Sequence, residues 1–170
     1  MNRKRVMIAD ASLIAGSHLK KEFIDQGFGA INVTNIDDGV KTLKSWERRG
    51  EKLPDVYVIE LNLHPKDIEG GLQFIKKLAS KFSYQFENPE QFYKSIVIYS
   101  RSVVKNPGEC LEEAKKDLGV DIESFSKRLE KLSKIYHKLL DLGITEDRII
   151  LKSDMEMPEL VNYVKSLYSI

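Results

Sequence analysis

The sequence contains a single cysteine, Cys110, among its 170 residues. One thiol cannot form an internal disulfide, and it excludes metal sites built from several cysteines. The three histidines, His18, His64 and His137, are far apart and lack the paired spacing of a zinc site on one helix face. We therefore expect Cys110 to be a structural or surface thiol, and we expect no catalytic zinc.

An excess of one charge and a long apolar run are also missing. The net charge is only +1, which is too small to draw the chain to nucleic acid or to a membrane surface. The basic start from Met1 to Arg5 leads into a short apolar run that is neither a signal peptide nor a membrane span. We expect a cytoplasmic protein with no nucleic-acid or membrane partner.

A glycine-rich phosphate loop is the third absence. Gly70 and Gly71 have neither the lysine of a phosphate-binding loop nor the spacing of a dinucleotide fingerprint around them. We expect these glycines to serve a turn that leads into a helix. The sequence therefore does not indicate an enzyme that uses a nucleotide cofactor.

The chain does contain a regular alternation of short apolar runs and amphipathic segments, which is typical of βαβ units around a parallel sheet. Strands are expected near residues 4–10, 30–34, 55–60, 95–100 and 148–152. Helices are expected near residues 12–26, 37–49, 70–82 and 157–168, with a two-part helical segment over 108–142. This pattern predicts an α/β fold with a doubly wound, five-stranded parallel sheet. The length suits one domain over residues 1–170.

Three residues suit the ends of these helices. Ser12 can cap the first helix, and Gly27 can end it in a left-handed conformation. Pro158 stands at the start of the last helix, where a backbone N–H would have no partner within the helix, so its absence costs nothing.

The segment from residue 101 to residue 147 is too long for one crossover helix, and Gly119 divides it. Its second part carries an apolar stripe at helical spacing: Ile122, Phe125, Leu129, Leu132, Ile135, Tyr136, Leu139 and Leu140. We expect this stripe to pack on the sheet or on a neighbouring helix, and the alternative is a partner or dimer surface. The aromatic stretch 82–93 is expected to be an irregular packed loop, since Lys94 is the only nearby cation for a base-stacking surface.

Four of the expected strands end on a polar or charged residue: Asp10, Glu60, Ser100 and Lys152. In open α/β sheets, ligands bind in the crevice outside the carboxyl ends of the strands. We therefore expect two carboxylates, a hydroxyl and an ammonium to converge at one end of the sheet.

In this order, the motifs resemble the receiver domain of two-component response regulators, and the resemblance covers nearly the whole chain. The segments IELNLHP (59–65) and GLQFIKKL (71–78) are similar to the family's phosphoacceptor strand, loop and third helix, with one extra loop residue. IDDGV (36–40) resembles the start of the second helix. The resemblance implies the flavodoxin-like strand order 2-1-3-4-5, with an enlarged helical segment between strands 4 and 5.

The family's site residues are only partly present. Ser100 and Lys152 stand where receivers carry a hydroxyl and the lysine that contacts the phosphoryl group. Receivers also carry an acidic pair that holds Mg²⁺ after the first strand, whereas here Ala9 precedes Asp10. Asp10 and Glu60 are the remaining candidate ligands, so we expect Mg²⁺ binding to be weak or absent and expect no other cofactor.

The phosphoacceptor position itself is occupied by Glu60. Its carboxylate projects one methylene further than that of aspartate, roughly to where an aspartyl phosphate would place its oxygens. We expect Glu60 to pair with Lys152 and to accept a hydrogen bond from Ser100, which mimics the phosphorylated contacts. The alternative is that Glu60 and Lys152 form an ion pair that only stabilises the fold and has no role in signalling.

Three further departures bear on the state of the site. Arg101 stands where receivers generally carry a small residue, and its bulk is expected to cover the site. Ile149 occupies the position that is often a switching aromatic. Ser153 follows Lys152 where the family usually has proline.

The resemblance implies a pseudo-receiver: a non-enzymatic, phosphorylation-independent signalling module that acts through a protein partner. Receivers use their fourth helix, fifth strand and fifth helix as the output surface, and a second copy of this chain is an alternative partner. The candidate contacts on this surface are Tyr136, His137, Lys138 and Tyr163.

Two other functions remain open on the sequence alone. One is an atypical phosphate-accepting receiver that uses Asp10 or Asp67. The other is a metal-dependent hydrolase on the same fold, with Asp10 and Glu60 as metal or acid–base groups, because a fold does not fix a function.

Overall fold

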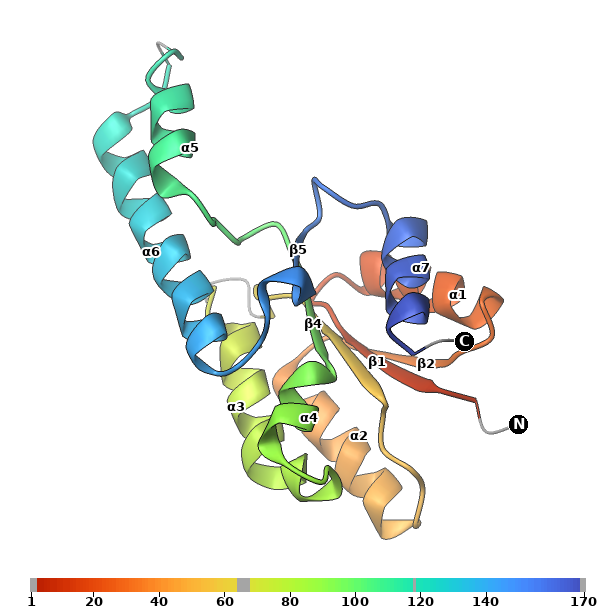
Figure 1. Cartoon of the computed structure of the whole chain (residues 1–170). Coiled ribbons are helices and arrows are strands. Elements are labelled where there is room, and N and C mark those ends of the chain that lie inside the picture. The colour runs from red at the N-terminus through yellow and green to blue at the C-terminus, as the bar shows by residue number, and fades with distance from the viewer. Residues whose placement is uncertain (1–2, 64–67, 118, 169–170) are drawn as a thin grey trace.

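The structure is a computed structural model, and it describes residues 3–63, 68–117 and 119–168. Five strands form one parallel sheet: β1 (Arg5–Ala9), β2 (Gly29–Val33), β3 (Val56–Ile59), β4 (Ile96–Ser100) and β5 (Ile149–Leu151). Their order is β2-β1-β3-β4-β5 (Figure 1), which confirms the predicted doubly wound sheet. Every residue of β3 and β4 is buried, as the continuous apolar runs of a covered parallel sheet require.

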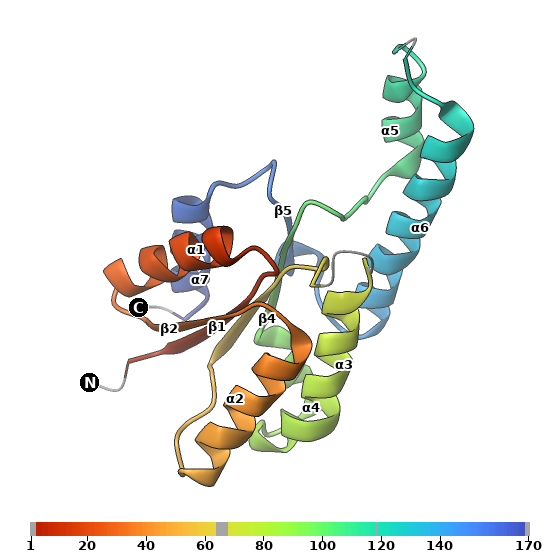
Figure 2. The same ribbon diagram turned by 180° about the vertical axis from the view of Figure 1, so that it is seen from behind.

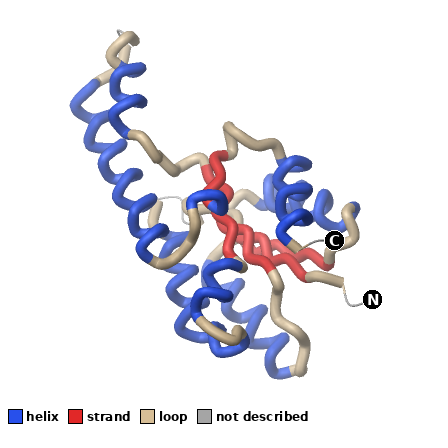
Figure 3. The backbone as a smooth tube through the Cα atoms, in the orientation of Figure 1, coloured by secondary structure: helices blue, strands red, loops and turns tan. Residues whose placement is uncertain are grey.

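Helices cover both faces of the sheet (Figures 1, 2 and 3). One face carries α1 (Leu13–Asp25) and α7 (Met157–Leu167), and the other carries α2 (Ile36–Arg48), α3 (Gly70–Phe82) and α4 (Pro89–Lys94). Side chains of β1 alternate between the two apolar clusters, because successive residues of a strand point to opposite faces. Among the described residues, none of the helices has the length and apolar composition needed to span a membrane.

The predicted helix ends are confirmed. Ser12 caps α1 by accepting a hydrogen bond from the Ala15 N–H at 3.2 Å. Gly27 follows α1 with φ of 89°, a conformation in which a Cβ would be strained. Pro158 lies in the first turn of α7.

The crossover from β4 to β5 contains α5 (Pro107–Ala114), α6 (Ile122–Asp141) and the 3₁₀ turn η2 (Glu146–Arg148), as the two-part pattern predicts. The C-terminal half of α6 joins the core through Ile135 and Leu139, each 0% exposed. The first half packs against α5, and this helical pair projects away from the rest of the fold (Figures 1 and 2). The later part of the apolar stripe therefore packs as expected, whereas Ile122 and Phe125 at its start remain partly exposed.

The aromatic stretch is packed, but the prediction of an irregular loop was wrong. It forms the 3₁₀ turn η1 (Ser83–Gln85) and then α4. Asn88 caps α4 by accepting from the Gln91 N–H at 2.9 Å, and Pro89 occupies the first turn. Phe92 is 0% exposed and contacts the rings of Tyr57 on β3, Phe86 and Tyr93, which fixes this segment against the sheet.

Candidate functional site

Asp10, Glu60, Ser100 and Lys152 lie together at the carboxyl edge of the sheet. Asp10, Glu60 and Lys152 directly follow β1, β3 and β5, and Ser100 ends β4. Asp10 and Glu60 are each 7% exposed, and Ser100 is 0% exposed. The sheet therefore brings all four residues into one largely water-excluded place.

The ammonium of Lys152 lies between the two carboxylates. Its Nζ is 2.8 Å from Oδ2 of Asp10 and 2.8 Å from Oε2 of Glu60. Burial alone would lower the pKa of Lys152, but the negative charges of Glu60 and Asp10 outweigh it, so its pKa is raised above the usual value. Lys152 is therefore firmly charged, and it offsets one of the two negative charges.

The second oxygen of Glu60 is also engaged. Oε1 accepts from the hydroxyl of Ser100 and from the backbone N–H of Asn62, the latter at 3.3 Å. Both contacts expected for Glu60, with Lys152 and with Ser100, are present. Hydrogen bonds to an ionised acceptor are stronger than neutral ones, so this carboxylate is held in one orientation.

Two residues that the sequence analysis did not select extend this network. The Asn62 side-chain amide donates to the Ser102 hydroxyl at 2.6 Å, and the Ser102 N–H donates to the Ser100 hydroxyl at 3.0 Å. The side-chain oxygen of Asn62, Oδ1, is buried with no hydrogen-bond partner in the described part of the chain. A signal for Asn62 exists in the sequence, since it is a polar residue between two leucines of a buried run.

Gly71 fixes the backbone below Glu60. A Cβ on Gly71 would lie 2.6 Å from the Glu60 carbonyl oxygen and 2.7 Å from the Leu61 Cα, so only glycine fits there without movement. The Gly71 N–H donates to the Leu61 carbonyl at 2.8 Å. Gly70 and Gly71 thus form the first turn of α3 and let it approach the end of β3 closely.

The two candidate Mg²⁺ ligands, Asp10 and Glu60, are both paired with Lys152. Each carboxylate oxygen of Asp10 and Glu60 already accepts from a donor, since Oδ1 of Asp10 bonds the Ser12 N–H at 2.8 Å. A divalent metal needs several free oxygen ligands, and here the Lys152 ammonium holds the position between the acids. The described residues contain no group of three or more His, Cys, Asp or Glu placed to hold a metal.

The remaining predicted residues lie around this site or outside the described ranges. Arg101 is exposed and lines, together with Asp10, Glu60 and Lys152, an open pocket of about 280 Å³. Ile149 is 2% exposed and belongs to the core. The alternative acceptor Asp67, like His64 and Pro65, lies outside the described residues.

The candidate output residues do not all reach the surface. Tyr136 is only 6% exposed and packs in the core, so its prediction as a contact residue was wrong. His137 is exposed, and Lys138 pairs with Glu69 at 2.9 Å. The hydroxyl of Tyr163 donates to the Asp147 carbonyl at 2.8 Å. Tyr136 points inward because it lies one turn after Leu132 and one turn before Leu139 on the buried stripe of α6.

No protein-family model matches the chain, and no curated protein matches it in sequence. Solved structures do match it. A response regulator from Thermotoga maritima superimposes with a TM-score of 0.56 at 16% identity, over 99% of this chain and 100% of that one. A CheY-like receiver domain protein from Methanospirillum hungatei gives 0.56 at 12% identity, over 99% and 96%.

An orphan response regulator of H. pylori gives a TM-score of 0.54 at 15% identity, over 98% of both chains. The chain therefore has the fold of CheY-like receiver domains along nearly its whole length. The residues at the carboxyl edge must carry any argument about function, because the identity is low.

Proposed function

We propose that residues 1–170 form one receiver-like signalling domain that works without phosphorylation, with Glu60 in place of a phosphorylated aspartate. This proposal rests on one observation: both oxygens of the Glu60 carboxylate have a partner. One oxygen pairs with Lys152 and the other accepts from Ser100. These are the hydroxyl and ammonium positions that the resemblance assigns to phosphoryl contacts.

The charges at the site favour the permanent negative charge of Glu60 over a phosphoryl group that is added and removed. The buried part of the site holds two carboxylates and one ammonium, and the other cation that lines its pocket, Arg101, is exposed to solvent. An incoming phosphoryl group would add negative charge to a buried, already negative place, and such burial is unfavourable without a further cation. Weak or lost Mg²⁺ binding is part of the same proposal, because the expected counter-ion position is held by Lys152.

The activity we propose is non-enzymatic protein recognition. The topological positions of the family's output elements are filled here by the α5–α6 pair, β5 and α7. His137, Lys138 and Tyr163 are the predicted residues that remain on this surface. A protein partner would meet the exposed faces of these helices, and a second copy of the chain is the alternative occupant.

The test is incubation of the native protein with phosphoramidate or acetyl phosphate and Mg²⁺, followed by intact-mass measurement. We expect no phosphoryl adduct on the native protein. The matched variant is Glu60→Asp, which withdraws the carboxylate by one methylene from Ser100 and Lys152. An adduct found only on that variant would show that the longer side chain of Glu60 prevents phosphorylation of the native protein.

Two outcomes would replace this proposal. A stable adduct on the native protein, mapped by peptide mass to Asp10 or Asp67, would establish an atypical phosphate acceptor. Metal-dependent turnover of p-nitrophenyl phosphate, lost in both Asp10→Asn and Glu60→Gln, would establish a hydrolase.

A further inference from the structure

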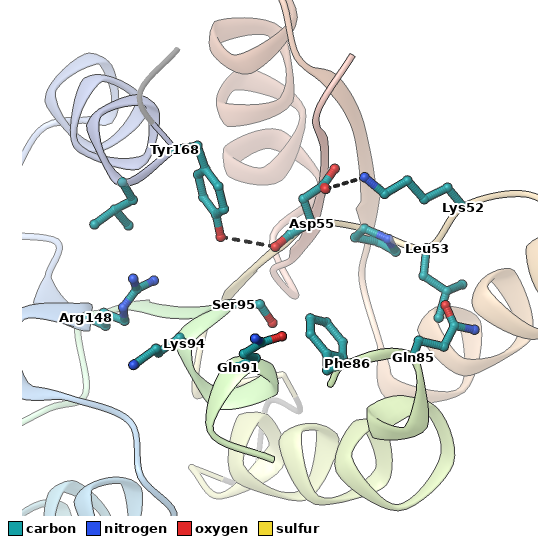
Figure 4. A pocket seen from close by; sticks show the side chains of 12 residues that line it. Lys52, Leu53, Asp55, Gln85, Phe86, Gln91, Lys94, Ser95, Arg148 and Tyr168 are labelled. Atoms are coloured by element: carbon teal, nitrogen blue, oxygen red, sulfur yellow. Dashed lines mark hydrogen bonds and ion pairs between the residues drawn. The ribbon is translucent and has the colours of Figure 1, made fainter. Parts of the chain in front are cut away.

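A second pocket, of about 460 Å³, lies at the opposite edge of the sheet (Figure 4). Three of its lining residues, Asp55, Ser95 and Arg148, directly precede β3, β4 and β5, so the pocket opens where these strands begin. Its volume is within the range of small-molecule sites in proteins. It shares no lining residue with the pocket beside Glu60.

Three cations line this pocket, and their environments differ. Lys52 pairs with Asp55 at 2.6 Å, and Lys94 pairs with Glu90. The Nη1 of Arg148 is buried and has no hydrogen-bond partner in the described part of the chain. A buried guanidinium N–H without an acceptor is costly, so Nη1 of Arg148 can take a ligand oxygen as its acceptor, while the guanidinium also interacts with the Tyr168 hydroxyl.

The carboxylate of the neighbouring Asp147 has another partner. Asp147 accepts from the Tyr163 hydroxyl, at 2.8 Å on its carbonyl and 3.1 Å on its carboxylate. The planar fork of arginine suits the oxygens of a phosphate or carboxylate. Lys94 lies beside it in Figure 4, and its ion pair with Glu90 is solvent-exposed and therefore weak. This side of the pocket therefore favours an anionic group.

The opposite side has a different character. In Figure 4, Arg148 and Lys94 lie at one end of the pocket, Phe86 and Gln85 at the other, and Gln91 between them. The ring of Phe86 is held in place by the buried Phe92, at 5.5 Å between centroids. An aromatic face with two side-chain amides suits a planar group that carries hydrogen-bonding edges.

We propose that this pocket binds a nucleoside monophosphate, with its phosphate on Arg148 and Lys94 and its base beside Phe86. Gln85 and Gln91 would bond the edge of the base. A glycine-rich loop is not required, because the two side-chain cations supply the charge that such a loop provides through its N–H groups. The proposal is independent of the function proposed for the carboxylate edge.

The test is calorimetric titration of the full chain with AMP, GMP, CMP and UMP, and with adenosine and inorganic phosphate as partial probes. We expect at least one nucleotide to bind, and both partial probes to bind at least about tenfold more weakly, which corresponds to ~1.4 kcal/mol. Arg148→Gln and Lys94→Gln should each weaken the nucleotide by about tenfold or more. Arg128→Gln on the exposed face of α6 is the matched control and should leave the affinity unchanged.

Amide chemical shifts locate the bound nucleotide in the same samples. We expect shifts at Ser95 and Tyr168, and none at Ser12 or Ser102. The proposal is overturned if none of the four nucleotides binds at millimolar concentration, or if inorganic phosphate binds as tightly as the nucleotide. The proposal is equally overturned if the Arg148→Gln variant is folded by circular dichroism and keeps the native affinity. Shifts at Ser12 or Ser102, at the carboxyl edge of the sheet, would also overturn it.

Discussion

The ammonium of Lys152 lies 2.8 Å from the carboxylate of Glu60, and this contact joins the ends of β5 and β3 across β4. β3 and β5 are each paired with β4 and not with one another. Asp10 at the end of β1 and Ser100 at the end of β4 join the same group. The site therefore ties four of the strands together at one edge, so that changes in it should affect both stability and conformation.

Glu60→Gln should destabilise the fold by about 1–3 kcal/mol. Glu60 accepts from Lys152, Ser100 and the Asn62 N–H, and a neutral amide must turn its NH₂ toward one of these donors. Urea unfolding measures the change. Glu130→Gln, which removes an exposed ion pair with Lys134 on α6, is the control and should leave the unfolding midpoint unchanged. Equal midpoints for both variants would contradict the structural role of Glu60.

The pKa of Lys152 should lie above its ordinary value of 10.5, because Glu60 and Asp10 favour its charged form despite burial. NMR titration of the Lys152 Cε resonance measures it, and Glu60→Gln should move the midpoint down. Because the folded pKa is raised, the stability contributed by Lys152 is fully present below about pH 10.5 and is lost as the pH rises through the folded pKa. A midpoint below 10.5 in the native protein would refute this arrangement.

Gly71→Ala should destabilise the protein by about 1–3 kcal/mol, although alanine is the better helix former. The new Cβ would lie 2.6 Å from the Glu60 carbonyl oxygen, a backbone atom that cannot turn away. Gly108→Ala, with nothing within 4 Å of the new Cβ, is the matched variant and should stabilise α5 by about 0.5–1 kcal/mol. Thermal unfolding of the two variants shows whether each change in stability has the expected sign. A Gly71→Ala variant as stable as the native protein would contradict the close approach of α3 to the end of β3.

Tyr57→Phe should stabilise the protein by about 1–2 kcal/mol, because it removes a hydroxyl that is buried without a hydrogen-bond partner in the described residues. The opposite sign is expected for Tyr99→Phe, which loses the bond from its hydroxyl to the Met155 carbonyl at 2.9 Å. That loss should cost about 1 kcal/mol. Urea unfolding of both variants measures the two changes in stability. Destabilisation by Tyr57→Phe would mean that the native Tyr57 hydroxyl has a hydrogen-bond partner.

Much of the fold follows from local patterns in the sequence. Apolar runs that end on a polar residue locate β1, β3, β4 and β5 to within two residues, because a covered parallel strand must be apolar throughout. Ser12, Gly27 and Pro158 mark helix ends through their own backbone preferences. The convergence of Asp10, Glu60, Ser100 and Lys152 follows in turn, since the carboxyl ends of parallel strands share one edge.

Other features depend on contacts between distant segments, and local patterns do not determine them. The bond from Asn62 to Ser102 joins two loops 40 residues apart. The pocket at Arg148 exists only because the starts of β3, β4 and β5 meet at one edge. The helix at Pro89 had a local signal, the cap at Asn88, which the aromatic composition obscured.

The central claim is that the charge of Glu60 holds the carboxyl edge of the sheet in one arrangement. Hydrogen–deuterium exchange of the native protein and of Glu60→Gln tests it most directly. We predict faster exchange in the variant over residues 101–106 and 151–154, which follow Ser100 and surround Lys152, and unchanged exchange over α2. Identical exchange over these segments in the two proteins would contradict the claim and would reduce Glu60 and Lys152 to a structural ion pair.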